Sequence, residues 1–268
     1  MSLSSVSSVI SPEVDFQALA PGFRVTKPFN HVVIDDFFES SIAHGLAGEF
    51  PDFESPIWAE YNNPIEIKKL CNRWDKFPKL TYSVFDYLNS PKFVELMGTL
   101  VGEKLYSDPG LNGGGWHTHK AGGKLNTHLD YSIHPKLGLE RRINIIVYVQ
   151  PEWKPEYDGA LGLWAANETG NGPGKLEVEI PCNFNRAVIF DTSQNSWHGL
   201  PEPVRSPEGT NRNSIAAYFL CEPRAGASER GKALFAPFGE QAQDESILEL
   251  IRLRSQVATS ASVYGDKK

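Results

Sequence analysis

The sequence has 268 residues, of which 40% are hydrophobic and 22% are charged, as is usual for a globular protein that buries a core. Its formal net charge is -7, so the chain lacks the excess of basic residues that nucleic-acid binding requires, and no nucleic-acid partner is expected. No apolar run of about 18 residues is present, so neither a membrane-spanning helix nor a membrane partner is expected. The three cysteines are widely spaced and form no CxxC pair, which favours a reduced, cytoplasmic protein.

The first third of the chain is expected to be mainly helical. Residues 1–22 begin with a serine-rich stretch and are expected to be a flexible tail. An edge strand is expected near 32–34, and residues 39–104 are expected to provide a helical support. Apolar periodicity predicts helices at about 40–50, 64–72, 78–90 and 91–101.

The pattern changes in residues 105–222, where short apolar segments alternate with Gly, Pro and Asn clusters. Strands are expected at 114–119, 124–130, 142–150, 160–165, 175–180, 186–191, 196–200 and 212–220. About eight short strands with long connections suit a jelly roll. Residues 223–268 are expected to form a loop and a helix at about 243–258. We therefore predict one mainly β domain over residues 23–268, with a jelly-roll core buttressed by N-terminal helices and a C-terminal helix.

A histidine and a carboxylate lie two positions apart in the strand expected at 124–130. Because side chains at i and i+2 of a strand point to the same face, His128 and Asp130 could hold one metal ion together. His198 follows another apolar strand and could be the third ligand. Two histidines and one carboxylate with open positions are the ligand set of non-heme Fe(II) oxygenases. The HxD pattern alone is short, and a chance occurrence on a surface strand is the alternative.

Arg212 directly precedes the apolar strand SIAAYFL. Its planar guanidinium could bind the distal carboxylate of a small diacid through two hydrogen bonds. Ser214 lies on the same strand face and could donate a further one. A surface salt bridge is the alternative role for Arg212.

Five motifs, taken in order, resemble the prolyl-hydroxylase-like branch of the Fe(II)- and 2-oxoglutarate-dependent oxygenases. They are HLD at 128–130, RRINIIVYVQPEW at 141–153, DGALGLW at 158–164, NRAVIFDTSQNSWHG at 185–199 and RNSIAAYFL at 212–220. The resemblance covers roughly residues 27–222 and implies a double-stranded β-helix, a variant of the jelly roll.

The resemblance also implies roles for individual residues. His128, Asp130 and His198 match the iron ligands of the family. Arg212 matches the residue that binds 2-oxoglutarate, although the interval between His198 and Arg212 is longer than usual, and Tyr148 matches a second contact to this co-substrate. Dioxygen is then the other co-substrate, and ascorbate is a possible stimulant.

Six further residues are candidates for contacting the substrate or supporting the ligands. Strand alternation places Arg142 and Asn144 on the same face as Tyr148. An ion pair is the alternative for Arg142, and core packing is the alternative for Trp116. The full set is Asn126, Asn144, Arg142, His117, His119 and Trp116.

The resemblance implies an oxidation, usually a hydroxylation, that forms succinate and CO2. Related halogenases carry a small residue at the position of Asp130, so halogenation is not expected. The acidic charge and the glycine-rich stretch near 113–123 favour a small polar, amino-acid-derived metabolite as the substrate. A prolyl or other residue in a protein or peptide is the alternative. A non-catalytic cupin-like binding protein and a metalloenzyme that does not use 2-oxoglutarate are more remote. The sequence does not indicate an oligomeric state.

Overall fold

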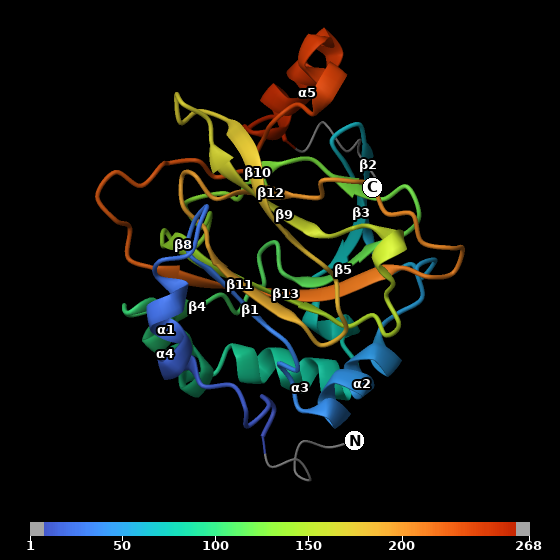
Figure 1. Ribbon diagram of the computed structural model, residues 1–268, viewed down its shortest axis with the longest axis vertical. Helices are drawn as coiled ribbons and strands as arrows, with labels where there is room; N and C mark the ends of the chain where they lie inside the picture. Colours follow the sequence, from blue (N-terminus) through green and yellow to red (C-terminus); the bar gives the residue numbers. More distant parts are fainter. Residues whose placement is uncertain (1–7, 261–268) are drawn as a thin grey trace.

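The computed structural model describes residues 8–260, which form two antiparallel β-sheets with helices packed on the outside (Figure 1). Within these residues, the larger sheet has nine strands in the order β1-β11-β8-β13-β5-β3-β2, with β4 paired to β13 and β6 to β3. The smaller sheet has five strands in the order β10-β9-β12-β7-β14. The strands are β1 (His31–Ile34), β2 (Ala59–Asn63), β3 (Glu66–Cys71), β4 (Tyr106–Ser107), β5 (Gly115–His119), β6 (Lys124–Leu125), β7 (His128–Leu129), β8 (Glu140–Tyr148), β9 (Leu161–Ala166), β10 (Pro173–Ile180), β11 (Ala187–Asp191), β12 (Trp197–Gly199), β13 (Arg212–Cys221) and β14 (Leu234–Phe235). The expected double-stranded β-helix core is thereby confirmed.

Helices α1 to α4 lie along the outer side of the larger sheet, whereas α5 lies at the other end of the molecule, against β14 (Figure 1). In the part of the chain that the structure describes, no helix is long and apolar enough to cross a membrane, and the longest, α4, has 11 residues. The helices are α1 (Phe16–Phe23), α2 (Ser40–Glu49), α3 (Lys79–Leu88), α4 (Pro91–Val101) and α5 (Glu245–Arg254), with 3-10 turns at Trp74–Lys76, Pro155–Tyr157 and Gly239–Gln243.

Local sequence signals set the bounds of helix α4. The Ser90 hydroxyl accepts a hydrogen bond from the Phe93 backbone N–H, and Pro91 occupies the first helical position. The helix ends at Gly102, whose φ of 85° lies in the left-handed region that glycine adopts without strain. The helices expected near 40–50, 78–90, 91–101 and 243–258 are confirmed.

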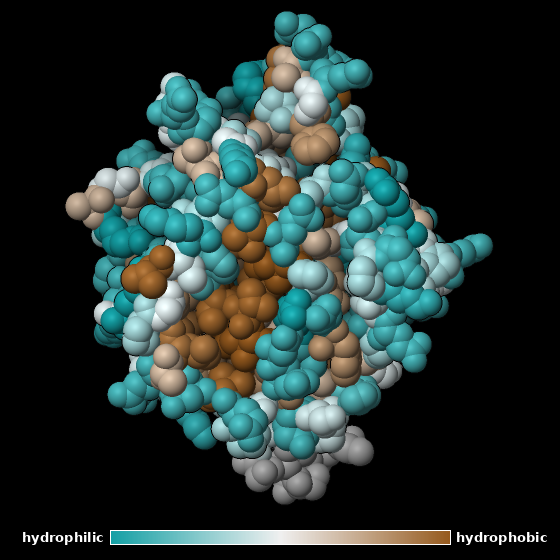
Figure 2. Space-filling view, viewed as in Figure 1, coloured by the Kyte–Doolittle hydropathy of each residue, from teal (hydrophilic) through white to brown (hydrophobic). Residues whose placement is uncertain are grey.

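Two apolar clusters hold the layers together. The first packs the N-terminal helices against the larger sheet, and the rings of Phe93 and Phe219 within it have centres 5.8 Å apart. The second fills the space between the sheets with side chains such as Leu163 of β9 and Val188 of β11. Figure 2 shows apolar side chains gathered along the middle of one face, over the region of β1 and β11 in Figure 1. Both sheets are therefore fixed by burial, so a cavity that side chains of both sheets line has rigid walls.

The prediction of a flexible tail over residues 1–22 is wrong for the end of that stretch. Asp15 caps helix α1 by accepting the N–H groups of residues 17 and 18. Phe16, Ala20 and Phe23 are buried, and the ring of Phe16 lies 5.9 Å from that of Phe93 in α4. Apolar burial against α4 therefore orders this segment. Residues 1–7 lie outside the described part of the chain.

The helix expected at 64–72 is instead strand β3, which pairs with β2 in an antiparallel hairpin. The Asn63 side-chain oxygen accepts the N–H groups of Ile65 and Glu66 and so closes the turn. The strand expected at 124–130 is also interrupted. Its first part, β6, pairs with β3 in the larger sheet, and its second part, β7, pairs with β12 in the smaller one. The chain thus crosses between the sheets beside the candidate site.

Candidate metal and co-substrate site

Strands β7 and β12 bring the three expected metal ligands together. His128 and His198 form a cross-strand pair, and Asp130 follows directly after β7. One ligand atom from each of the three buried side chains lies within 4.8 Å of the other two. The Nδ1 atom of His128 lies 3.0 Å from the Asn126 carbonyl, and that of His198 lies 2.8 Å from the Ser196 carbonyl. Because a carbonyl only accepts, each Nδ1 carries the proton and each Nε2 is left as a ligand.

The ionisation of these side chains suits a divalent metal. Burial, and then the neighbouring His198, lower the pKa of His128 to about 3, and burial lowers the pKa of His198 as well. Burial opposes the ionised form of Asp130, but the neighbouring basic groups, Arg141 first among them, together outweigh burial and hold the pKa of Asp130 below its usual value. Among residues 8–260, Asp130 Oδ2 has no hydrogen-bond donor. Two neutral imidazoles and a carboxylate with an unpartnered buried oxygen fit Fe(II).

Two arginines hold Asp130 in place. Arg141 Nη1 lies 3.2 Å from Asp130 Oδ1, and the Arg141 guanidinium carbon lies 3.4 Å from the ring centres of both Tyr131 and Tyr218. Arg230 Nη2 donates to the Asp130 backbone carbonyl at 2.7 Å. Arg141 thus binds Oδ1 of Asp130, and Oδ2 remains available to a metal.

A β-bulge in β8 decides which arginine reaches the cavity. The register between β8 and β13 shifts by one residue, which leaves Arg142 as the extra residue. As a result Arg141 lines the cavity together with Asn144. Arg142 was expected on that face, but it forms ion pairs with Glu103 and Asp191 and does not line the cavity. Strict alternation failed here because it assumes an unbroken ladder.

Arg212 also lines the cavity, and acceptors of the protein hold its guanidinium. Its Nε donates to the Gly159 carbonyl at 2.6 Å, and its Nη2 donates to the Tyr148 hydroxyl at 3.2 Å. Tyr148 therefore positions the guanidinium and is not itself part of the cavity lining. Arg212 and Ser214 pair in register with His119 and His117 on β5, so the four residues share one patch of the sheet.

This patch presents unsatisfied hydrogen-bonding groups. Within residues 8–260, both ring nitrogens of His119 are buried without a partner. Arg212 Nη1 and the Ser214 hydroxyl belong to residues that line the cavity, and they make no hydrogen bond to this part of the chain. Buried polar groups without partners carry a substantial free-energy cost, which a bound carboxylate would remove. The patch therefore fits the distal carboxylate of 2-oxoglutarate.

The other candidate residues have mixed outcomes. His117 and Asn144 line the cavity, and Asn144 Nδ2 donates to the Tyr218 hydroxyl at 3.2 Å. Asn126 supports His128 through its backbone carbonyl, whereas its side chain turns away to bond Gln241. Trp116 does not line the cavity. Only 1% of its surface is exposed, and its ring packs in the core below the larger sheet.

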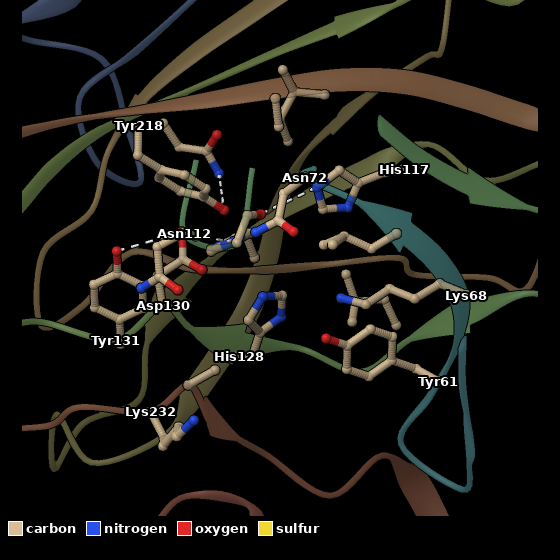
Figure 3. Close-up of a pocket in the computed structure, with 18 of the residues that line it drawn as sticks. Tyr61, Lys68, Asn72, Asn112, His117, His128, Asp130, Tyr131, Tyr218 and Lys232 are labelled. Atoms are coloured by element: carbon tan, nitrogen blue, oxygen red, sulfur yellow. Dashed lines mark hydrogen bonds and ion pairs between the residues drawn. The ribbon is translucent and has the colours of Figure 1, made fainter. Parts of the chain in front are cut away.

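The cavity has a volume of about 340 Å³ and is completed by residues that no sequence motif singled out. Figure 3 shows Tyr61 and Lys68, from the β2–β3 hairpin, on one side, with Tyr218 and Asp130 on the opposite side. Lys232 enters from the C-terminal segment. Asn62-Asn63-Pro64 is a turn signal that could have indicated the hairpin. Nothing local marks Lys232.

The comparison with protein families matches residues 114–220 to the 2OG-Fe(II) oxygenase superfamily. This segment includes the three candidate metal ligands and Arg212. Among curated proteins, the chain is 30% identical to prolyl 3-hydroxylase OGFOD1 of Xenopus laevis over 79 residues, which are 30% of this chain and 15% of the relative. The mouse protein of the same name is 32% identical over 79 residues. The match thus spans only a small part of these relatives.

Two solved structures share the fold. The prolyl-4-hydroxylase of Pseudomonas putida superposes with a TM-score of 0.57 at 13% identity, covering 78% of this chain and 100% of the other. A Trichoplax adhaerens prolyl hydroxylase, solved with a hypoxia-inducible-factor peptide fragment, gives 0.53 at 14% identity and covers 76% and 88%. At these identities the similarity establishes the architecture of the two sheets.

Proposed function

We propose that the protein, whose residues 114–220 match the 2OG-Fe(II) oxygenase superfamily, is a dioxygenase that hydroxylates a C–H bond of a small polar, amino-acid-derived metabolite. Iron(II) is the metal, and 2-oxoglutarate and dioxygen are the co-substrates. The observation that carries this proposal is the coexistence of two built sites in one cavity. The cluster of His128, Asp130 and His198 lines the same cavity as the patch around Arg212, whose hydrogen-bonding groups lack partners.

The residues of the site have definable tasks in this reaction. His128, Asp130 and His198 hold the metal, which supplies the oxidising chemistry when it is bound and leaves succinate and CO2 as products. Arg212 and Ser214 bind the distal carboxylate of 2-oxoglutarate and so fix the orientation of its keto acid. Phe235 stacks on His128 with ring centres 5.0 Å apart and shields the ligand from water. Asp130 supplies a carboxylate ligand, which supports hydroxylation over halogenation.

The enclosure of the cavity supports a small substrate. The β2–β3 hairpin and the segment around Lys232 and Phe235 contribute to the lining along with the sheets. A volume of about 340 Å³ must hold both 2-oxoglutarate and the substrate. The buried, unpaired cysteines at 71, 182 and 221 support the expected cytoplasmic setting.

Hydroxylation of a prolyl residue in a protein or peptide is the second candidate. The similarity to prolyl 3-hydroxylase OGFOD1 favours this candidate, although the similarity extends over only 79 residues. A peptide needs a groove that is open at both ends. The two candidates therefore differ in whether free metabolites or peptides increase turnover.

The proposal is tested by following succinate. Wild-type protein with Fe(II), ascorbate, dioxygen and 2-oxoglutarate is expected to form succinate slowly, and faster when a substrate is present. Asp130→Ala removes one of three metal ligands and is expected to leave no metal-dependent succinate. Asp86→Ala, at an exposed position on α3, is the matched control and is expected to retain the wild-type rate. Succinate formation that persists in Asp130→Ala, or none in the wild type, contradicts the proposal.

A further inference from the structure

Among the described residues, uncharged groups alone hold the guanidinium of Arg212 in place. Its Nε–H is shared between the Gly159 carbonyl at 2.6 Å and the Cys182 Sγ at 3.2 Å, and its Nη2 donates to the Tyr148 hydroxyl. Within residues 8–260, no ion pair joins Arg212 to an Asp or Glu side chain. Its positive charge therefore remains available to a ligand, because no carboxylate of this part of the chain competes for it.

Cys182 follows strand β10 and reaches this guanidinium from the apolar cluster between the sheets. Only 1% of its surface is exposed, and it packs in the same cluster as Tyr148 and Leu163. Its side chain does not line the cavity. Burial raises the pKa of the Cys182 thiol, so the group stays protonated at neutral pH. A buried thiol of this kind is unreactive, and the role of Cys182 therefore comes from its contacts.

The protonated thiol bridges the arginine and the backbone. The Cys182 Sγ donates to the Gly159 carbonyl at 2.8 Å, and it accepts from Arg212 Nε. The same carbonyl accepts from both the thiol and the guanidinium, so the three groups form a closed set of contacts. Each contact limits the movement of the other two groups, which holds the Nε edge of the guanidinium in one position.

The backbone at Gly159 confines the aliphatic part of the same side chain. A Cβ atom at this position would lie 3.0 Å from Arg212 Cδ and 3.1 Å from Val204 Cγ2. The φ of Gly159 is 73°, which glycine adopts without strain. The glycine thus lets the chain pass close against Arg212, and the arginine has little space into which it could retreat.

We infer that Cys182 is a positioning residue that fixes the depth of Arg212 in the cavity and so selects the chain length of the keto-diacid co-substrate. This inference rests on the proposed function, because it treats Arg212 as the partner of the distal carboxylate of 2-oxoglutarate. In that function the co-substrate spans the distance from the metal site to Arg212. A guanidinium that cannot move back leaves no room for a co-substrate that is one methylene longer.

The test compares two keto diacids of different length. 2-Oxoglutarate and 2-oxoadipate, which is one methylene longer, are titrated into oxygen-free protein loaded with Fe(II), and binding is measured by calorimetry. The wild type is expected to bind 2-oxoglutarate at least about tenfold more tightly. In Cys182→Ala the guanidinium gains space and loses one partner, so this preference is expected to fall to about threefold or less. The affinity of Cys182→Ala for Fe(II) is expected to equal that of the wild type.

Two further variants separate positioning from a general effect of the substitution. Cys182→Ser keeps a small group that can both donate and accept a hydrogen bond, and it is expected to retain most of the preference. Cys221→Ala removes another buried thiol, at the far end of β13, the strand that begins with Arg212. This control is expected to bind both keto diacids as the wild type does.

Three results overturn the inference. They are equal affinity for the two keto diacids in the wild type, a full preference that survives in Cys182→Ala, and a loss in Cys182→Ser or Cys221→Ala as large as that in Cys182→Ala. If 2-oxoglutarate fails to bind the wild type, the proposed function fails as well. If it binds the wild type and Cys182→Ala keeps the full preference, only the positioning role is refuted.

Discussion

Asp130 is held by a guanidinium that has almost no freedom to move. Arg141 lies between two tyrosine rings at 3.4 Å from each ring centre, and it also donates to the Asn112 carbonyl. Stacking on both faces and hydrogen bonds at the edge fix the plane of the guanidinium. The carboxylate of Asp130 is therefore oriented before any metal arrives, which lowers the cost of forming the site.

Replacing this arginine should weaken metal binding. Arg141→Met keeps much of the side-chain volume but leaves Asp130 without its cation. We expect the affinity for Fe(II) to fall by about 10- to 100-fold, as for other partners of metal ligands. Arg141→Lys keeps the charge without the planar fork and is expected to lie between the two. Metal titration under anaerobic conditions measures this.

The exposed Arg252→Met on α5 serves as the control, because it also removes one ion-paired arginine. Its metal affinity should equal that of the wild type. An Arg141→Met protein that is folded and binds Fe(II) as tightly as the wild type contradicts the role of Arg141.

At the scale of the elements, two segments outside the motifs complete the walls of the cavity. The β2–β3 hairpin supplies Tyr61 and Lys68, and the segment after β13 supplies Lys232 and Phe235. This second segment is attached to the sheet by Arg224. Its Nη2 lies 2.7 Å from Glu140 Oε1, and its backbone N–H donates to Glu140 Oε2 at 2.8 Å.

The attachment predicts a pH dependence of stability. Burial alone would raise the pKa of Glu140, but the hydrogen bonds and the charge of Arg224, with a smaller contribution from Arg142, together outweigh burial and lower the pKa below the ordinary value of 4.5. A lowered pKa in the folded state means that the pair stabilises the protein above about pH 4.5 and that this contribution is lost as the pH falls through the folded-state pKa. Glu140→Gln should therefore cost roughly 1–2 kcal/mol at pH 7 and much less near pH 3. Denaturant unfolding of both proteins at each pH measures the difference.

Glu249→Gln on α5 provides the comparison, since Glu249 pairs with Arg252 at the surface. It should leave unfolding unchanged at both pH values. A cost of Glu140→Gln that is as large at pH 3 as at pH 7 would show that the glutamate acts through packing and not through its charge.

The same elements show where sequence patterns stop being informative. Residues 64–72 contain Ile67, Leu70 and Cys71 at the spacing i, i+3, i+4, which also suits a helix, and only pairing with β2 and β5 makes them a strand. The exchange of Arg142 for Arg141 in the cavity depends on a bulge, and bulges depend on how two distant strands pair.

For the whole molecule, the core and the positions of the candidate ligands were predictable because their signals are local. Short apolar segments with turn residues indicated most strands of the two sheets, and His128, Asp130, His198 and Arg212 each lie in or beside such a segment. The enclosure of the site was not predictable in this way. It is built by residues 59–71 and 231–254, which are far from the motifs in sequence and reach the cavity only through tertiary packing. We therefore expect substrate recognition to depend on these two segments, which lie outside the motifs.

The central claim is that one cavity binds the metal and 2-oxoglutarate together. Calorimetric titration of 2-oxoglutarate into oxygen-free protein, with and without Fe(II), tests it most directly. We predict binding that requires the metal and that weakens at least about tenfold in Arg212→Gln, because one charged hydrogen-bonding partner is lost, while the affinity for Fe(II) stays unchanged. If 2-oxoglutarate does not bind, binds equally well without the metal, or binds Arg212→Gln as tightly as the wild type, the claim is contradicted.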